Sequence, residues 1–327
     1  MTKIAVVSDI HLKLRKDEQF ELGRFKQLIY HLCYTDCDVV VFNGDLLHYA
    51  EPTLKEIFQI DQAMYALTDN TLRPNTKPKK VWLLSGNHEA PTYAFDTYWY
   101  LTTPCIENPK SHSPRVTYDG VTIQMCSWHV LNHLWDGQLD PADILITHYR
   151  SKMPGLYDEE IDTSLFKDRY KLMILGDIHA RYSPEPHAHY TSSPYSTAFT
   201  PITGKTKYGY IELTLDNGKY DWAYIDLDLP QKYKVELTFD QLKDFKPEAR
   251  HLYRVEVTGT IDQLNTLTNT KNVRYIKKLE QPNRPATAAA TTTNASFIDV
   301  LSEKVETSIS KRKAEVKNIL VQVKGTS

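Results

Sequence analysis

The sequence has little of several features that mark specialised classes of protein. Only 4 of its 327 residues are cysteines, which argues against a disulfide-stabilised scaffold. No run of about 18 consecutive apolar residues occurs, so we expect no membrane-spanning helix. The start "MTKIAVVSDIH" becomes charged too early for a signal peptide. The formal net charge of -2 gives the whole chain no electrostatic attraction for nucleic acid or membranes. We therefore expect a cytoplasmic protein without membrane contact, in a bacterial cell or in the host cytoplasm if the source is viral.

The few cysteines, Cys33, Cys37, Cys105 and Cys126, are expected to be buried thiols. Cys33 and Cys37 are close in sequence, which leaves a zinc site as an alternative, but no second cysteine pair accompanies them. Apolar residues make up 41% of the chain. This proportion is enough for a packed core, and a chain of this length usually forms more than one domain.

Five short apolar runs have the pattern of strands buried on both faces, because they lack alternation with polar residues. The runs are Ile4 to Val7, Val39 to Phe42, Val81 to Leu84, Ile144 to Ile146 and Leu172 to Leu175. Apolar residues recur at helical spacing between the first and second runs and between the second and third. This order predicts an α/β fold with a mostly parallel sheet, in which the strand C-termini lie along one edge.

The later part of the chain predicts a second sheet and a small additional domain. A hairpin at 116–126 and antiparallel strands in "HAHYTSS", "YGYIELTL" and "YDWAYIDLDL" are expected to complete a two-sheet sandwich flanked by helices, over residues 1–229. Residues 230–280 predict a small α+β domain with strands at 233–237, 252–257 and 273–277 and short helices at 239–245 and 261–267.

The C-terminal part of the chain changes in composition. Residues 281–296 are rich in Pro, Ala and Thr and predict a flexible linker. Residues 297–324 carry apolar side chains at helical spacing. A single tethered helix needs a partner surface to be stable, so we expect it to dock on another protein. Folding back on its own domain and a disordered tail are the alternatives.

A metal-competent residue follows each of the five apolar runs. These residues are Asp9 and His11, Asp45 and His48, Asn87 and His88, His148, and Asp177 and His179. Any one of them is explained equally well as a turn or cap residue. The group, however, includes five of the 12 histidines. Carboxylate, imidazole and amide ligands without thiolate suit Mn²⁺ or Mg²⁺, and the set is large enough for two ions.

The sequence blocks that contain these residues resemble those of a known family. "SDIH", "NGDLLH", "SGNHE", "THY" and "GDIH" are similar, in order and approximate spacing, to the signature blocks of calcineurin-like metallophosphoesterases. Within that family, the histidine ending "GDLLH", the segment "YTSSPYSTAF" and the small domain resemble the DNA nuclease subunit SbcD and its eukaryotic counterpart, the meiotic-recombination-eleven nuclease. The resemblance covers residues 1 to about 280.

The resemblance implies a role for each residue of the set. One ion would be held by Asp9, His11, Asp45 and His179, and the other by Asp45, Asn87, His148 and Asp177. Asp45 would then bridge the two ions. His88 would stabilise or protonate the departing sugar oxygen, and His48 would orient the substrate phosphate or His88.

Residue 177 departs from the family pattern, because the family has histidine where this chain has Asp177. An aspartate can bind Mn²⁺ or Mg²⁺ through oxygen, which would lower the net charge of the loaded centre from about +2 to about +1 and weaken its attraction for phosphate. Alternatively, Asp177 is a turn residue and the second ion is loosely held.

The implied activity is that of a Mn²⁺-dependent DNA exonuclease and endonuclease that acts through a metal-bridging hydroxide, in an SbcCD-like complex for DNA recombination, repair and replication. The expected partners are DNA ends or hairpins, an SbcC-type SMC-like ATPase bound by residues 297–324, and a second copy of the chain. The small domain would cap DNA.

The basic residues Lys13, Arg15 and Lys16 and the segment 77–80 are candidate phosphate contacts or ordinary surface. The run "YAFDTYWY" fits base stacking or core packing. A small-substrate phosphoesterase and a non-catalytic scaffold with a weakened metal site are the alternative functions.

Overall fold

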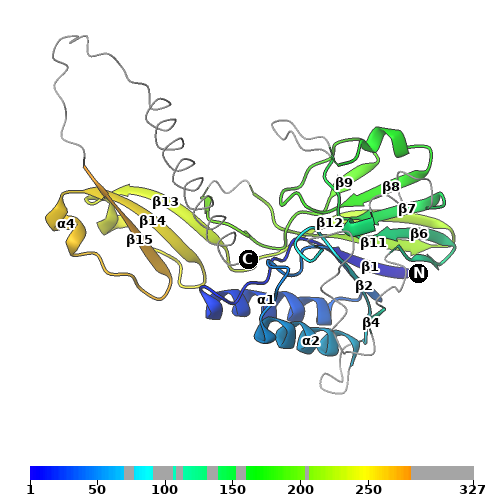
Figure 1. Cartoon of the computed structure of the whole chain (residues 1–327), viewed down its shortest axis with the longest axis horizontal. Helices are drawn as coiled ribbons and strands as arrows, with labels where there is room; N and C mark the ends of the chain where they lie inside the picture. The colour runs from blue at the N-terminus through cyan, green and yellow to red at the C-terminus, as the bar shows by residue number, and fades with distance from the viewer. Residues whose placement is uncertain are drawn as a thin grey trace, which may run out of the picture. The chain divides into compact units, whose positions relative to one another are not determined.

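The computed structural model describes residues 1–69, 77–90, 106–107, 113–130, 139–151, 160–202 and 206–280 (Figure 1). The predicted linker at 281–296, the predicted helix at 297–324, the run "YAFDTYWY" and Cys105 lie outside the described residues. Met1–Glu280 form one compact unit. None of the described helices is both long and apolar enough to cross a membrane.

The first sheet has the strand order β12-β11-β1-β2-β3-β4. Its strands are β1 (Thr2–Val7), β2 (Val39–Asn43), β3 (Lys80–Leu84), β4 (Ile106–Glu107), β11 (Gly209–Asp216) and β12 (Lys219–Asp226). β1 to β4 are parallel, and the β11–β12 hairpin joins β1 in antiparallel orientation. The first three predicted strands and the predicted hairpin at 209–226 are therefore confirmed.

Helices α1 (Glu18–Tyr34) and α2 (Leu54–Thr68) cover one face of this sheet (Figure 1). They connect the parallel strands, as the helical spacing predicted, and α2 begins with a capping box formed by Thr53 and Glu56. Because side chains alternate along a strand, Ala5 and Val7 pack under the helices while Ile4 and Val6 face the second sheet.

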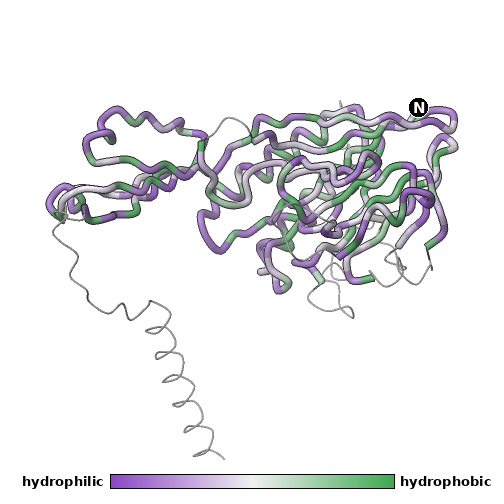
Figure 2. Tube along the Cα trace, turned by 90° about the horizontal axis from the view of Figure 1, so that it is seen from above, coloured by the Kyte–Doolittle hydropathy of each residue, from purple (hydrophilic) through white to green (hydrophobic). Residues whose placement is uncertain are grey.

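The second sheet has the order β5-β6-β7-β8-β9 and packs against the first through a shared apolar core. Its strands are β5 (Arg115–Tyr118), β6 (Val121–Cys126), β7 (Ala142–Thr147), β8 (Tyr170–Leu175) and β9 (Ala188–Tyr190), with short 3-10 turns η2 (Trp128–Val130) and η3 (Thr163–Phe166). Figure 2 shows hydrophobic residues along the strands of the facing sheets. The chain thus has the α/β two-sheet sandwich that was predicted.

Two details of the second sheet differ from the prediction. The apolar runs of β7 and β8 lie in this sheet and not beside β1 to β3. In addition, β9 was predicted to be antiparallel but pairs with β8 in parallel orientation. The segment between β8 and β9 is long enough for the chain to return to the starting end of the sheet, which a parallel connection requires. An apolar run predicts burial but not the sheet to which a strand belongs.

A third, smaller sheet contains only parallel strands, in the order β10-β13-β14-β15. It comprises β10 (Thr200–Pro201), β13 (Lys232–Thr238), β14 (Leu252–Gly259) and β15 (Val273–Leu279), with the 3-10 turn η4 (Gln241–Asp244) and helix α4 (Ile261–Asn265). The predicted elements are present, and the sheet has its own apolar cluster around Tyr253, Val255 and Val257. The division into domains at residue 230 stays a prediction.

Candidate metal centre

Four of the predicted metal ligands have a backbone conformation that is rare for residues with a side chain. The φ angle is 57° at Asp9, 49° at His11, 52° at Asp45 and 77° at Asp177. Each residue follows the end of a strand, β1, β2 or β8. Left-handed backbone is unfavourable for such residues and persists where the surrounding structure imposes it, often at functional sites. The three turns direct polar side chains toward a common region.

One group of ligands consists of Asp9, His11 and His179, whose candidate ligand atoms lie within 4.8 Å of one another. Nε2 of His11 lies 3.0 Å from Nε2 of His179, and Nε2 of His179 lies 3.5 Å from Oδ1 of Asp9. On the other side of the His179 ring, Nδ1 is 2.8 Å from the hydroxyl of Thr197. Thr197, which has no predicted role, fixes the orientation of this ring.

A second group consists of Asp9, Asp45 and His148, all of them buried. Oδ1 of Asp45 lies 3.5 Å from Nε2 of His148, and Oδ2 of Asp45 lies 3.4 Å from Nε2 of His11. The two oxygens of Asp45 therefore face histidines of different groups. Burial raises the pKa of Asp9. The same effect at Asp45 is outweighed by His148 and His11, which lower the pKa of Asp45 below its ordinary value.

The ring of His148 is held so that Nε2 faces the carboxylates. Nδ1 lies 2.7 Å from the backbone carbonyl of Asn43. Because a carbonyl only accepts, Nδ1 donates its proton there, and Nε2 points to Asp45. An added Cβ at Gly44 or Gly176 would lie 2.3 Å from Nδ1 of this ring, which explains a glycine at both positions. Burial lowers the pKa of His148, but Asp45 and Asp9 raise it well above its ordinary value.

Three buried polar atoms in this region have no hydrogen-bond partner among the described residues. They are Oδ1 of Asp9, Oδ1 of Asn87 and Nε2 of His148. Leaving a buried acceptor unpaired is costly, and native proteins do so mainly where a ligand or ion is bound. An amide oxygen, a carboxylate oxygen and an imidazole nitrogen are all ligands of divalent cations such as Mn²⁺. The residues present therefore fit metal ions.

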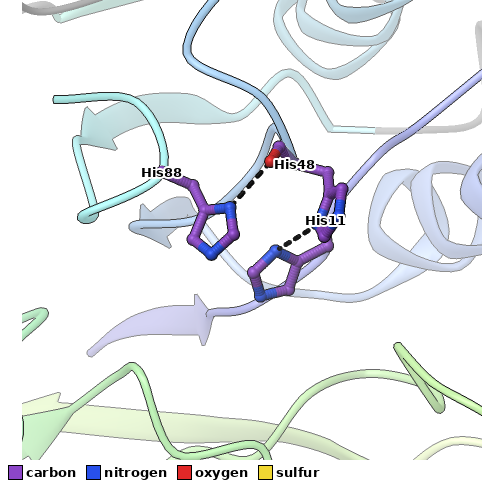
Figure 3. A group of neighbouring side chains, drawn as sticks. All are labelled: His11, His48 and His88. Atoms are coloured by element: carbon purple, nitrogen blue, oxygen red, sulfur yellow. Dashed lines mark hydrogen bonds between the residues drawn. The ribbon is translucent and has the colours of Figure 1, made fainter. Parts of the chain in front are cut away.

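The predicted catalytic histidines lie beside the metal ligands (Figure 3). Nδ1 of His88 donates to the backbone carbonyl of His48 at 2.7 Å, while Nδ1 of His48 lies 3.3 Å from Nδ1 of His11 (Figure 3). The rings of His48 and His88 are stacked, with centroids 5.2 Å apart. Nε2 of His88 lies 3.9 Å from Oδ2 of Asp45. Burial, and then the neighbouring Lys13, lower the pKa of His48 to about 4, so this ring is neutral at pH 7.

Asp177 has two polar partners in the structure. Its Oδ2 accepts a hydrogen bond from Nε of Arg150 at 2.5 Å, and its Oδ1 lies 3.4 Å from Nδ2 of Asn87. Asp177 belongs to neither of the two ligand groups described above. Arg150 was not among the predicted site residues, although it is two residues after His148 in "THYR".

Glu89 is a further residue without a role in the sequence analysis, although it ends the block "SGNHE". Its buried carboxylate accepts hydrogen bonds from the backbone amides of Asp45, Gly86 and Leu47 at 2.9, 2.9 and 2.6 Å. Burial, and then Asp45, raise its pKa to about 8. Glu89 thus ties together the turns that present Asp45 and Asn87.

The described cysteines lie outside this centre. Cys33, Cys37 and Cys126 are buried, as predicted. Cys37 Sγ lies 3.4 Å from Oε2 of Glu212, and Cys33 bonds to the carbonyl of Ala66. Burial raises the pKa of Cys37 to about 12. Candidate ligand atoms of Asp36, Cys37 and Glu212 lie within 4.8 Å of one another, and Cys33 is not part of this group.

Known proteins include relatives of this chain. A model of the calcineurin-like phosphoesterase family matches residues 2–181. The chain is 25% identical over 292 residues to the "Probable exonuclease subunit 1" of Escherichia phage T5, covering 81% of each chain. Two solved structures are also similar at 13% identity. An archaeal phosphodiesterase has a TM-score of 0.35, covering 68% of this chain and 100% of its own. A protein of Thermus thermophilus has a TM-score of 0.41, covering 68% and 98%.

Proposed function

Because the chain belongs to the calcineurin-like phosphoesterase family, we propose that it is a Mn²⁺-dependent DNA exonuclease and endonuclease with two metal ions. The position of Asp45 is the main support. Its two oxygens lie 3.4 Å from Nε2 of His11 and 3.5 Å from Nε2 of His148, so this carboxylate faces one histidine of each ligand group, and Asp9 belongs to both groups. A carboxylate shared between two sites is the arrangement that brings two ions close enough to act on one phosphate. The similarity to a phage exonuclease subunit supports a nucleic-acid substrate.

In this proposal, Asp9, His11, Asp45 and His179 hold one ion, and Asp45, Asn87, His148 and Asp177 hold the other. Mn²⁺ is favoured and Mg²⁺ is possible, because the ligand atoms are oxygen and imidazole nitrogen. When bound, the ions would activate water and neutralise charge on the scissile phosphate. The buried ligands are held by their own hydrogen bonds, such as that between Ser8 and Asp9 at 2.5 Å.

His88 is placed to move a proton at the leaving oxygen. Its Nδ1 donates a hydrogen bond to the carbonyl of His48, and its Nε2 lies 3.9 Å from Oδ2 of Asp45. A proton on Nε2 could therefore be transferred to the departing sugar oxygen. His48 supplies the carbonyl that orients His88, and its ring contacts His11, so the expected orienting role of His48 is supported through its backbone.

A basic cavity next to the centre supports a polyanionic substrate. The cavity of about 280 Å³ is lined by Lys13, Lys16, Asp17, Glu21, Thr197, Ala198, Phe199, Lys232 and Arg254. Thr197 lines the cavity and is hydrogen-bonded to His179, so the cavity lies next to the proposed centre. Lys232 is paired with the buried Glu21, so Lys13, Lys16 and Arg254 are the cationic groups of the cavity that attract phosphates of a nucleic-acid backbone, which compensates for the small net charge of the chain.

We also propose that the chain works in a complex with an ATPase and with a second copy of itself. Residues 297–324 dock on an SbcC-type ATPase, the small parallel sheet caps DNA, and the complex serves DNA recombination, repair and replication. A homodimer is supported by an exposed apolar face on α1 and α2, where Tyr30, Phe58 and Tyr65 are 57%, 57% and 42% exposed. Deleting residues 281–327 should abolish co-purification with the ATPase and leave Mn²⁺ binding intact. Undiminished co-purification would reject this docking role.

The function is tested by incubating the chain with linear duplex DNA and Mn²⁺, with and without the ATPase. Asp45→Asn should abolish cleavage and leave the circular dichroism spectrum unchanged. The matched control is Asp140→Asn, because Asp140 is 83% exposed and lies 3.8 Å from Nη1 of Arg115. Activity of Asp45→Asn within a few-fold of the parent chain would refute the assignment. Hydrolysis of an aryl phosphodiester without any action on DNA would favour a small-substrate phosphoesterase, and failure to bind Mn²⁺ would favour a scaffold.

A further inference from the structure

An ion pair next to the centre accompanies the aspartate that replaces the expected histidine. Nε of Arg150 lies 2.5 Å from Oδ2 of Asp177, and the two side chains are 26% and 9% exposed. The pair is thus largely shielded from water, where charge-assisted hydrogen bonds are strong. The second oxygen of Asp177 lies on the side of Asn87, whose own Oδ1 is buried without a partner among the described residues.

The position of Arg150 follows from the register of the second sheet. Thr147 of β7 pairs with Leu175 of β8 in parallel orientation, so the segments that follow the two strands also run side by side. Successive side chains of an extended segment point to opposite sides. Arg150 therefore lies on the same side as His148, toward Asp177, whereas Tyr149 is buried in the apolar cluster on the other side.

The backbone of Arg150 is fixed as well. Its amide donates to Oε2 of Glu160 at 2.9 Å, and its carbonyl accepts from the amides of Glu160 and Ile161 at 2.7 and 3.1 Å. Glu160 is held in turn by Nε1 of Trp128 at 2.8 Å. A guanidinium on such a fixed backbone can define the orientation of the carboxylate that it binds.

We infer that Arg150 is a positioning residue of the second metal site: it holds Asp177 so that Oδ1 can act as the ligand that replaces histidine, and it returns the positive charge that the aspartate removes. This inference rests on the proposed two-ion centre.

The charge balance supports the inference. With Asp9, Asp45 and Asp177 ionised, two divalent ions leave a net charge of about +1, and the Arg150 guanidinium restores about +2. That is the charge of a centre with a neutral histidine at position 177 and no paired arginine. The expected weakening of attraction for phosphate is therefore compensated by Arg150.

The test measures Mn²⁺ binding to the full chain by calorimetry and by electron paramagnetic resonance, which counts free Mn²⁺. The parent chain should bind two ions. Arg150→Gln should weaken one of them by about 10–100-fold, the usual effect of losing a residue that orients a ligand, and leave the other unchanged. The affinity of Arg150→Lys for that ion should lie between those of the parent chain and of Arg150→Gln, since lysine keeps the charge without the planar donor. Arg181→Gln is the matched control, because Arg181 pairs with Asp226 and stacks on Tyr224. It should bind both ions as the parent does.

The decisive comparison uses Asp177→His. In that background the arginine has no carboxylate to orient, so adding Arg150→Gln should change the affinity for the second ion by less than about 3-fold, the range of ordinary surface substitutions. An equal loss in both backgrounds would mean a merely structural role and would overturn the inference. The double variant also keeps the test open if Arg150→Gln alone fails to fold, because no buried carboxylate is then left unpaired.

The remaining outcomes separate the inference from the proposed function. Two ions bound by the parent and by Arg150→Gln with equal affinities would overturn the role of Arg150 and leave the two-ion centre intact. A parent chain that binds one ion or none would overturn the centre itself, and with it this inference.

Discussion

A buried cluster of charges beside the basic cavity predicts a strong dependence of stability on Glu21. One oxygen of Glu21 pairs with Lys232, and the other accepts from Nε of Arg24 at 2.9 Å. The three side chains are at most 4% exposed. Arg24 also donates to the carbonyl of Ser196, next to Thr197. The cluster therefore joins α1 and β13 to the segment that contacts His179, a proposed metal ligand.

The substitution Glu21→Gln removes the only negative charge of this trio. Two buried cations would then face a neutral amide, and losing one partner of a buried ion pair costs about 3–5 kcal/mol. For a domain of this size, such a loss lowers the melting temperature by roughly 6–20 °C, at about 2–4 °C per kcal/mol. Glu18→Gln is the matched control, since Glu18 lies on the surface of the same helix as Glu21 and pairs with Lys55 of α2. Its effect should stay within about 0.5 kcal/mol.

The effect should also depend on pH through Lys232. Burial, and then Arg24, lower the pKa of Lys232 from 10.5 to about 8. A lysine whose pKa is lowered by folding destabilises the folded chain at low pH, and stability is regained as the pH rises from 8 toward 10.5. Glu21→Gln should lower this pKa further. The loss of unfolding free energy caused by Glu21→Gln should therefore be smaller at pH 9.5 than at pH 7, by about 1.4 kcal/mol for each unit by which the pKa of Lys232 falls between these two pH values.

The assay is urea unfolding followed by circular dichroism at pH 7 and pH 9.5, with EDTA present so that metal binding does not contribute. A loss below about 1 kcal/mol for Glu21→Gln at pH 7 would refute the buried-charge argument, since it would fall in the range of surface pairs. An equal loss at both pH values would refute the part that involves Lys232.

Three further predictions concern the centre itself. Gly176→Ala should destabilise the chain by about 1–3 kcal/mol in urea unfolding, because the new Cβ would lie 2.3 Å from Nδ1 of His148. Gly23→Ala, in a helix with nothing within 4 Å, should instead stabilise it by about 0.5–1 kcal/mol, and equal effects would contradict the packing argument. Thr197→Val should weaken Mn²⁺ binding in calorimetry by about 10–100-fold through loss of the hydrogen bond to His179, and unchanged affinity would contradict that role. Chelation by EDTA should lower the melting temperature and Mn²⁺ should restore it, with about 2.7 kcal/mol gained when the free ion is at about 100 times its Kd. An unaltered melting curve would count against a metal site.

Much of the fold could be predicted because its elements depend on local patterns. The apolar runs identified β1, β2, β3, β7 and β8, and the spacing of residues such as Phe25 and Ile60 identified α1 and α2. The direction of β9 was predicted wrongly, since a three-residue strand carries no local signal of the strand beside it. Membership of β7 and β8 in the second sheet was not predictable for the same reason.

The candidate site divides in the same way. Metal-competent residues could be found from the sequence alone, because each follows an apolar run and because five histidines share that setting. Their partition into two groups with Asp45 between them depends on distances across two sheets. The residues that hold the ligands were missed. Glu89, Thr197 and Arg150 act through contacts with residues up to 44 positions away in the chain.

The sequence by itself therefore determined the chemistry of the centre: carboxylates, imidazoles and an amide at strand ends, in the order of a known family. Only the tertiary structure decided the environment of Asp177. Strand pairing brings Arg150 within 2.5 Å of it, and this proximity arises from the register of β7 and β8. The physical reason is that a ligand type is a property of one residue, whereas charge compensation is a property of two residues brought together by folding.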